Sequence, residues 1–277
     1  MGTIILPAVI VAVVGLIAAI ILTIASKLMY VPVDEKVAAI REVLPGANCG
    51  ACGFAGCDDY AAAFSDNPDL STALCPVGGA GVSAQIAEVL GVDAAEADPM
   101  VAMVMCQGNY GVTQKIMEAD RIHTCKEAKM FYGGQWACPY GCLGLGDCYN
   151  VCKFDAISIQ NGVAKIDRDK CVACGACENV CPNHIISMVK KKNLVFVACK
   201  SMDKGAKTRK TCENGCIGCM KCQKSCKFEA IKVENNVAQV DLDACKNCGL
   251  CAKECPTGAI INFRKKKAPA KKVEAAN

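Results

Sequence analysis

The chain begins with a continuous apolar segment that has no polar face. Residues 4–26 carry no charged side chain over 23 positions. A helix of this length would be about 35 Å long, enough to cross a hydrocarbon layer of about 30 Å. A cleaved signal peptide is the alternative, but no Lys or Arg precedes the segment, and the segment is longer than a typical signal core. Lys27, Lys36 and Arg41 follow it, and by the positive-inside rule they place the rest of the chain in the cytoplasm. The pattern predicts a single-pass anchor over residues 1–29 in the lipid bilayer of the cell membrane.

Beyond the apolar segment, short amphipathic elements alternate with loops. Residues 58–64 and 82–90 show helical spacing of apolar positions, and each is predicted to form a short helix. Residues 156–166 and 230–240 alternate apolar and polar side chains around an Asn-Gly or an Asn-Asn pair. Alternation on both sides of such a pair is typical of a β-hairpin. Short helices together with hairpins predict an α+β fold.

The two hairpin segments belong to an internal repeat. When the chain is displaced by 74 residues, KFDAISIQNGVAKIDRDKC aligns with KFEAIKVENNVAQVDLDAC, and nine cysteines fall on nine others without a gap. A repeat this strict indicates a duplicated structural unit. The predicted domains are an anchor at residues 1–29, a small domain at 34–92, a linker at 93–124, two tandem modules at 125–190 and 191–264, and a disordered lysine-rich tail at 265–277.

Cysteine usage decides the chemistry. The chain has 24 cysteines in tight groups, among them CVACGACENVCP at residues 171–182 and CKNCGLCAKECP at residues 245–256. Disulfide frameworks scatter their cysteines, and a zinc site needs two C-x2-C pairs rather than further ligands at these offsets. The run C-x2-C-x2-C-x3-C-P is the signature of bacterial ferredoxins, in which three thiolates hold one [4Fe–4S] cluster and the fourth holds a second cluster. Both modules are therefore predicted to be ferredoxin-like, with two clusters each, in a reducing compartment such as the cytoplasm.

The small domain carries a different cysteine pattern. It contains NCGACGFAGC at residues 48–57 and a further cysteine in CPVGG. Glycines between the ligands allow the backbone to curl around a cluster and to direct N–H groups at its sulfurs. A glycine-rich loop with one structural metal is the alternative. The predicted ligands of cluster 1 are Cys49, Cys52, Cys57 and Cys75.

In bacterial ferredoxins the fourth cysteine of each run binds the cluster held by the other run, and we use this rule to assign the ligands in both modules. In the first copy Leu145 stands where the second copy has Cys219, so Cys138 is taken as the substitute ligand of cluster 2. The predicted ligand sets are Cys138, Cys142, Cys148 and Cys181 for cluster 2; Cys152, Cys171, Cys174 and Cys177 for cluster 3; Cys216, Cys219, Cys222 and Cys255 for cluster 4; and Cys226, Cys245, Cys248 and Cys251 for cluster 5.

Four cysteines remain outside these sets. Cys106, Cys125, Cys199 and Cys212 are possible extra ligands, and their number would suit a sixth [4Fe–4S] cluster. Cys125 and Cys199 occupy equivalent repeat positions, however, which favours a local role in each module. The open alternative is that the four are unligated or redox-active thiols. The sequence thus predicts five [4Fe–4S] clusters and leaves a sixth open.

Charge is unevenly distributed, although the formal net charge is only +4. Residues 190–232 hold 12 basic and three acidic side chains. The docking patch predicted for an acidic electron-carrier protein comprises Lys190, Lys191, Lys192, Lys207, Arg209 and Lys210, because complementary charge speeds encounter. A solvated basic face is the alternative. No dinucleotide fingerprint, Walker loop or catalytic triad stands out, so we assign no catalytic residue and predict no nucleic-acid partner.

The order of these motifs resembles the B subunits of the Rnf complex, an ion-translocating ferredoxin:NAD+ oxidoreductase. The resemblance is carried by the uncharged N-terminal helix, by NCGACGFAGC with CPVGG, and by GCLGLGDCYNVCKFDAI, and it spans about residues 3–262. The second ferredoxin-like module is similar to that of the longer members. The resemblance implies a membrane-anchored electron-transfer subunit of the translocase, without an NAD site of its own. It would accept electrons from reduced soluble ferredoxin and relay them to other membrane and cytoplasmic subunits, toward NAD+ reduction with Na+ or H+ export.

Two other interpretations remain open on the sequence. A membrane-tethered polyferredoxin that serves a hydrogenase or a heterodisulfide reductase would carry similar motifs. A redox sensor without electron throughput would use thiols such as Cys125 and Cys199 to report oxidation, but a sensor has little need of five clusters. For the relay, we expect electrons to enter at the basic C-terminal modules and to leave through the cluster of Cys49.

Overall fold

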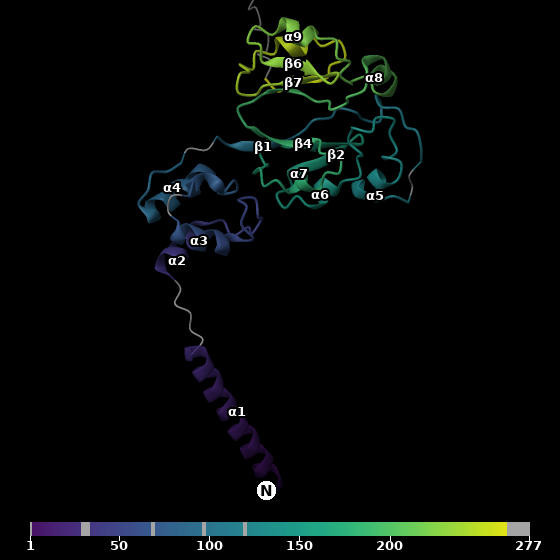
Figure 1. Cartoon of the computed structure of the whole chain (residues 1–277). Helices are drawn as coiled ribbons and strands as arrows, with labels where there is room; N and C mark the ends of the chain where they lie inside the picture. Colours follow the sequence, from purple (N-terminus) through teal and green to yellow (C-terminus); the bar gives the residue numbers. More distant parts are fainter. Residues whose placement is uncertain (1, 29–33, 68–69, 96–97, 119–120, 265–277) are drawn as a thin grey trace, which may run out of the picture.

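A computed structural model of the chain (Figure 1) describes residues 2–28, 34–67, 70–95, 98–118 and 121–264. Helix α1 spans Gly2–Leu28. Within the described part of the chain, no helix is both long enough and apolar enough to span a bilayer. The crossing predicted from residues 4–26 is therefore not supported, and the predicted tail at 265–277 lies outside the described residues.

The small domain packs three helices and a short 3-10 turn around one apolar core. Its elements are α2 (Glu35–Val43), α3 (Cys57–Asp66), η1 (Thr72–Leu74) and α4 (Gly79–Leu90). The helices predicted at residues 58–64 and 82–90 are confirmed, with slightly longer bounds. The largest side chains that meet in the core are Ile40, Leu44, Tyr60, Phe64 and Ile86. Because burial of one such side chain stabilises a fold by about 1.5–3 kcal/mol, this core holds the three helices around the cysteine-bearing loop.

Each ferredoxin-like module contains the predicted hairpin. In the first module β2 (Ile157–Gln160) pairs antiparallel with β3 (Val163–Ile166), and in the second β6 (Ile231–Glu234) pairs with β7 (Val237–Val240). The turns fall at the predicted Asn-Gly and Asn-Asn pairs. All four of these residues have positive φ, which a two-residue turn of the type I′ form requires. Both hairpins are therefore confirmed.

Two equivalent glycines allow the ligand loop of each module to touch its hairpin. Gly144 and Gly218 have φ values of +76° and +64°. A Cβ atom at either position would also run into a carbonyl oxygen of the hairpin turn, that of Gly162 or that of Asn236. A side chain would thus strain the backbone and clash with the turn. Glycine at these two positions sets how closely the cysteine loop packs on the hairpin.

A second pair of strands in each module joins distant parts of the chain. β1 (Met100–Val104) pairs antiparallel with β4 (Ile186–Lys190), and β5 (Val195–Val197) pairs with β8 (Ile260–Asn262). β1 lies in the segment 93–124, which the sequence predicted to be a linker. The run MVAMV has no apolar–polar alternation and is consistent with a fully buried strand, and four of its five residues are buried. The first module therefore takes one of its strands from outside the predicted domain.

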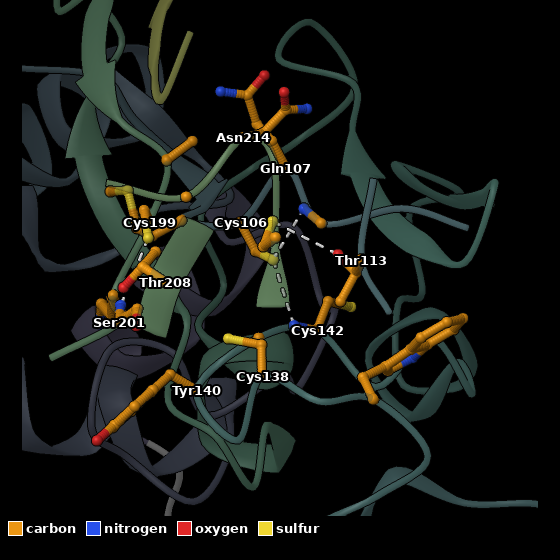
Figure 2. A pocket seen from close by; sticks show the side chains of 18 residues that line it. Cys106, Gln107, Thr113, Cys138, Tyr140, Cys142, Cys199, Ser201, Thr208 and Asn214 are labelled. Carbon is orange, nitrogen blue, oxygen red and sulfur yellow. Dashed lines mark hydrogen bonds between the residues drawn. The ribbon is translucent and has the colours of Figure 1, made fainter. Parts of the chain in front are cut away.

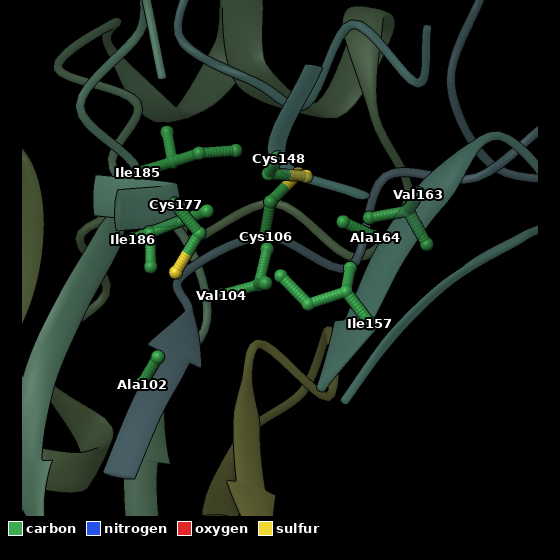
Figure 3. Close-up of a cluster of buried hydrophobic side chains, with 10 residues drawn as sticks. All are labelled: Ala102, Val104, Cys106, Cys148, Ile157, Val163, Ala164, Cys177, Ile185 and Ile186. Carbon is green, nitrogen blue, oxygen red and sulfur yellow. The ribbon is translucent and has the colours of Figure 1, made fainter. Parts of the chain in front are cut away.

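Short helices complete the two modules. They are α5 (Cys125–Met130), α6 (Asp147–Asn150), α7 (Ala176–Val180), α8 (Gly205–Thr211), α9 (Lys221–Ser225) and α10 (Leu250–Glu254). Each module has its own buried cluster of side chains. Figure 3 shows the cluster of the first module, where Cys148 and Cys177 pack among aliphatic side chains such as Val104 and Ile186. Cysteine is therefore part of the interior of this module.

The two modules pack against each other around one arginine. The guanidinium of Arg168, in the first module, lies over the rings of Phe196 and Phe263 in the second, at 5.5 and 5.1 Å from the ring centroids. The same guanidinium donates hydrogen bonds to the carbonyl oxygens of Lys191 and Asn193 at 2.8 and 2.9 Å. A cation over an aromatic face contributes about 0.5–2 kcal/mol, depending on its burial. This contact helps to fix the relative position of the modules.

Candidate metal centres

The four cysteines of the small domain line one cavity. Cys49, Cys52, Cys57 and Cys75 all border it. The side-chain oxygen of Asn48 accepts a hydrogen bond from the N–H of Cys57 at 2.8 Å, which fixes the ligand loop against the start of α3. The N–H of Gly78 donates to the Sγ of Cys75 at 3.4 Å. N–H donors on ligand sulfurs stabilise the negative charge of a thiolate–metal site. The structure thus brings together the four residues predicted for cluster 1.

A buried tyrosine hydroxyl borders the same cavity without a partner. Tyr60 is only 1 % exposed, and among the described residues no group forms a hydrogen bond with its hydroxyl. Burial, together with charge on Cys75 and Cys52, holds the pKa of Tyr60 above its usual value, so the hydroxyl keeps its proton. An unsatisfied buried hydroxyl costs about 1–3 kcal/mol. A sulfur acceptor in the cavity would satisfy it, so the donor set of this site fits an iron–sulfur cluster.

The second ferredoxin-like module groups its cysteines in two sets. Cys216, Cys219, Cys222 and Cys255 line one cavity, and these are the residues predicted for cluster 4. In the set predicted for cluster 5, burial together with charge on Cys245 and Cys248 raises the pKa of Cys251 to about 11. Cys226 packs against the same buried core of the module. The structure therefore places both predicted sets within this module.

The cluster 3 set of the first module comes together in the same way. Burial together with charge on Cys171, Cys174 and Cys152 raises the pKa of Cys177 to about 12. The N–H of Ala102, in β1, donates to the Sγ of Cys171 at 3.4 Å. Thiols with such pKa values would be ionised at neutral pH only when bonded to a metal.

The cluster 2 site differs from the sequence prediction. One cavity of the first module is lined by Cys142, Cys148 and Cys181, and its fourth cysteine is Cys125. Burial together with charge on Cys142 and Cys125 raises the pKa of Cys148 to about 12. Cys138, which the spacing suggested as the fourth ligand, does not border this cavity and lines another one instead. The structure thus pairs Cys125 with the other three residues.

Local contacts explain why Cys125 reaches this cavity. It is the first residue of α5, and the carboxylate of Asp147 accepts hydrogen bonds from the N–H groups of Cys125 and Lys126 at 2.8 and 3.0 Å. The backbone of Asp147, Leu145 and Gly146 lies close to the Cys125 thiol and moderates the rise in its pKa caused by burial. Cys125 therefore lies beside the position where a cysteine is missing from the first copy.

The other three cysteines that the spacing left unassigned accompany Cys138. Cys106, Cys138, Cys199 and Cys212 line a cavity between the two modules (Figure 2). A sequence pattern other than cysteine spacing could have indicated this site. VMCQG at residues 104–108 and VACKS at residues 197–201 are short matching segments that each follow an apolar run.

The cysteine sets surround cavities. Across the described ranges, no group of three or more His, Cys, Asp or Glu side chains is placed to hold a metal ion. In a [4Fe–4S] cluster each thiolate bonds to a different iron, so the ligands surround a volume instead of converging on one atom. Thiolate is the donor that such clusters use.

The first three residues of the predicted docking patch are paired with carboxylates. Lys190, Lys191 and Lys192 each form an ion pair, with N–O distances of 2.8, 3.1 and 2.7 Å. Lys190 pairs with Asp243 of the second module, and Lys192 pairs with Asp98 before β1. These ammonium groups thus join segments of the chain, and part of their charge is neutralised within the molecule.

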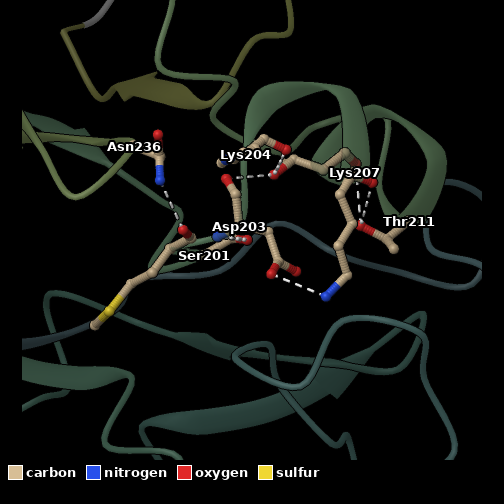
Figure 4. A network of polar contacts seen from close by, with 8 residues as sticks. Ser201, Asp203, Lys204, Lys207, Thr211 and Asn236 are labelled. Atoms are coloured by element: carbon tan, nitrogen blue, oxygen red, sulfur yellow. Dashed lines mark hydrogen bonds and ion pairs between the residues drawn. The ribbon is translucent and has the colours of Figure 1, made fainter.

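The remaining residues of the patch lie on α8. Lys207 pairs with Asp203 at 2.9 Å, in a polar network that also ties Asn236 of the hairpin turn to the loop before α8 (Figure 4). Arg209 and Lys210 are exposed on the last turn of α8. In the part of the chain that the structure describes, neither forms an ion pair. The predicted patch is therefore divided into a paired part and an unpaired part.

Comparison with known proteins connects these sites to iron–sulfur families. The family described as "Putative Fe-S cluster" matches residues 44–76, a 4Fe-4S binding domain matches residues 164–187, and a 4Fe-4S dicluster domain matches residues 215–259. The chain is 43% identical over 261 residues to the B subunit of the Na(+)-translocating ferredoxin:NAD(+) oxidoreductase complex of Acetobacterium woodii, covering 94% of this chain and 78% of that protein.

Two further relatives are similar over nearly their whole length. The B subunit of the proton-translocating ferredoxin:NAD(+) oxidoreductase complex of Clostridium ljungdahlii is 40% identical, over 94% of this chain and 93% of that protein. The B subunit of the ion-translocating oxidoreductase complex of Methanosarcina acetivorans is 36% identical, over 89% of this chain and 93% of that protein. These names differ in the coupling ion, so the similarity assigns no ion to this chain.

Proposed function

Because this chain belongs to the family of B subunits of ion-translocating ferredoxin:NAD(+) oxidoreductase complexes, the Rnf family, we propose a role for each of its sites in such a complex. The chain is an iron–sulfur electron-transfer subunit and works with other subunits of the oxidoreductase. The observation that carries the proposal is that sets of four cysteines line separate cavities in the small domain and in both ferredoxin-like modules.

The proposed cofactors are five [4Fe–4S] clusters, with one revision of the ligand sets. When bound, such a cluster accepts and releases single electrons at a potential set by its hydrogen bonds and its exposure. Clusters 1, 3, 4 and 5 keep the ligands predicted from spacing. The revised set for cluster 2 is Cys125, Cys142, Cys148 and Cys181. In each site the protein supplies thiolates, backbone N–H donors and an apolar wall that limits the access of water.

Reduced soluble ferredoxin is the proposed electron donor, and we place its docking site around Cys219. Cys219 is the one exposed cysteine among the 24 in the chain, so cluster 4 would lie near the surface. Lys221 and Lys224 of α9 are exposed within five residues of it. The start of α8 lies against Ile217: a Cβ atom built on Gly205 would meet the carbonyl group of Ile217. The basic end of α8 therefore belongs to the same region of the second module.

The docking proposal is tested by reversing charge where no ion pair is lost. Arg209→Glu combined with Lys210→Glu should slow the oxidation of reduced ferredoxin by about 10-fold at low ionic strength, because opposite charge steers association. The difference should shrink at high salt, where charges are screened. The matched control is Lys126→Glu combined with Lys165→Glu, which makes the same charge change at exposed positions of the first module.

The measurement is ferredoxin-dependent NAD+ reduction by the purified complex, recorded as a function of salt. A rate that falls equally in both double variants would show that overall charge matters and that docking does not occur at α8. Lys190→Glu is less informative, because it would place a carboxylate beside Asp98 and Asp243 and so disturb the fold.

We also propose that α1 attaches the subunit to the membrane, with the cluster domains on the cytoplasmic side. Support comes from the 23 consecutive uncharged residues at 4–26 and from the basic residues that follow them. Free thiolate ligands also need a reducing compartment. The family relation implies a membrane-associated complex, and the single crossing and its orientation are parts of this proposal.

A further inference from the structure

A second kind of four-cysteine cavity lies between the two ferredoxin-like modules. Its cysteines are Cys106, Cys138, Cys199 and Cys212, and none of them falls within the residues matched by the three iron–sulfur families. We propose that these four cysteines hold a sixth [4Fe–4S] cluster. The proposal rests on the iron–sulfur chemistry of the proposed function, but on none of the residues that hold clusters 1 to 5.

The cavity is larger than the other cluster sites, so it has room for a cluster. Its empty volume, including the part open to solvent, is about 460 Å³. The corresponding volumes are about 330 Å³ for the cluster 1 cavity and about 320 Å³ for the cluster 4 cavity. Cys142 also borders the cavity between the modules. Cys142 also lines the cluster 2 cavity, together with Cys125, Cys148 and Cys181.

The four sulfurs converge on this space. A Cβ atom built on Gly108 would lie 3.6 Å from the Sγ of Cys106 and 3.7 Å from the Sγ of Cys212. A Cβ atom built on Gly141 would lie 3.6 Å from the sulfurs of both Cys106 and Cys138. Each glycine thus leaves room between two sulfurs that come from different segments of the chain.

Cys199 completes the set from the opposite side. Its pKa is raised by burial to about 11, and charge on Cys138 contributes to the rise. The pKa of Cys138 is likewise raised, first by burial and then by charge on Cys212. Effects of this kind act over short distances. Figure 2 shows the sulfurs of Cys106, Cys138 and Cys199 around the same space.

Hydrogen-bond donors are already directed at these sulfurs. The Sγ of Cys106 accepts from the N–H groups of Gly108 and Cys142, both at 3.3 Å. The Sγ of Cys199 accepts from the N–H of Ser201 at 3.5 Å, and the Sγ of Cys212 accepts from the hydroxyl of Thr113 at 3.5 Å. Donors in these positions stabilise the negative charge of thiolates bonded to iron. They are not needed by neutral thiols, which accept hydrogen bonds weakly.

The site has the internal symmetry of the duplicated modules. Cys138 and Cys212 are repeat equivalents, since they lie 74 residues apart. Cys106 follows β1 by two residues, and Cys199 follows β5 by two residues. β1 and β5 play the same part in their modules, because each pairs with the last strand of its module. Each copy therefore contributes one cysteine after its edge strand and one before its first ligand run.

The position of the site suggests why both copies contribute to it. The N–H of Cys142, a ligand residue of cluster 2, donates to Cys106. The backbone of Cys216, a ligand residue of cluster 4, lies close enough to the Cys199 thiol to lower its pKa. The proposed site thus lies next to a ligand residue of a cluster in each module. A redox centre here would allow electrons to pass between the two modules.

Iron counting on the anaerobically purified full chain tests the proposal. Wild-type protein should contain about 24 iron atoms, and Cys106→Ser or Cys199→Ser should each contain about 20, because one [4Fe–4S] cluster is lost. The double variant should also contain about 20, since both residues serve the same cluster. Asn214→Ala, which changes another lining residue of the cavity, should keep about 24. Mössbauer or EPR spectra of the reduced protein should lose the signal of one cluster and keep the others.

The outcomes separate this proposal from the iron–sulfur assignment itself. Protein without iron would overturn both. About 20 iron atoms in the wild type and in the cysteine variants alike would overturn the sixth site alone. One zinc per chain that disappears in Cys106→Ser, with iron unchanged, would overturn it as well. A double variant that loses about eight iron atoms would show that Cys106 and Cys199 serve different clusters. Retained native spectra of the remaining clusters confirm that the variants are folded.

Discussion

Leu145→Cys should make Cys125 dispensable. Leu145 stands at the repeat position of Cys219, and it packs against the buried cluster that contains Cys125. A cysteine at position 145 would restore the C-x2-C-x2-C spacing of the second copy, so its sulfur should reach the cluster 2 cavity from the ligand loop itself. We therefore expect Cys125→Ser to lose cluster 2 and the double variant Leu145→Cys/Cys125→Ser to regain it.

The magnitudes follow from the ligand count and from the packing of Leu145. Cys125→Ser should lower the iron content by about four atoms per chain, and the double variant should recover those four. Leu145 is half-buried and packs against Cys125 and Leu143. Shortening it to cysteine should cost about 1–2 kcal/mol of folding free energy, less than a fully buried Leu→Ala change. The double variant should therefore bind the full complement of iron but unfold a few degrees below the wild type.

The assay is iron and acid-labile sulfide analysis of anaerobically purified protein, together with thermal unfolding. Cys138→Ser is the control, because spacing alone assigned Cys138 to cluster 2. In our assignment Cys138→Ser also loses about four iron atoms, but from the site between the modules, so Leu145→Cys should not restore them. Rescue of Cys138→Ser by Leu145→Cys, without rescue of Cys125→Ser, would refute the reasoning.

Two further predictions concern the loops and the N-terminal helix. Gly144→Ala and Gly218→Ala should each destabilise the cluster-loaded protein by about 1–3 kcal/mol in denaturant unfolding. The reason is that each substitution adds strain at positive φ and a clash with the hairpin turn. The control Gly81→Ala lies in a helix where a Cβ meets nothing within 4 Å, and it should stabilise the protein by about 0.5–1 kcal/mol. Equal effects at all three positions would contradict the steric argument. Deletion of residues 2–28 should release the subunit into the soluble fraction after an alkaline wash of membranes, whereas the full chain should stay with the pellet. Retention of the truncated chain would show that other contacts hold it there.

The structure confirms what local sequence patterns could specify. The helices α3 and α4 and the two hairpins were predictable, because their periodicity and turn residues act over a few neighbouring positions. The sets of clusters 3, 4 and 5 were suggested by spacing within each module, because crossing over between two adjacent runs is a property of the motif. The linker predicted at residues 93–124 did not include a strand, so β1 was missed. A buried strand without alternation cannot be distinguished by pattern from an apolar stretch of a linker.

The sequence by itself determined that this protein carries grouped thiolates in a duplicated α+β unit, since ligand spacing and repetition are written along the chain. The tertiary structure decided which distant cysteines share a site. Cys125 reaches the cavity proposed for cluster 2, where Asp147 holds the start of α5. Cys106 and Cys199 line one cavity, and each follows a strand that pairs with the last strand of its module. Strand pairing between distant segments follows no spacing rule that the sequence displays. The ungapped repeat aligns Cys199 with Cys125, although the structural counterpart of Cys199 is Cys106. Only packing of the two modules brings these four sulfurs around one cavity.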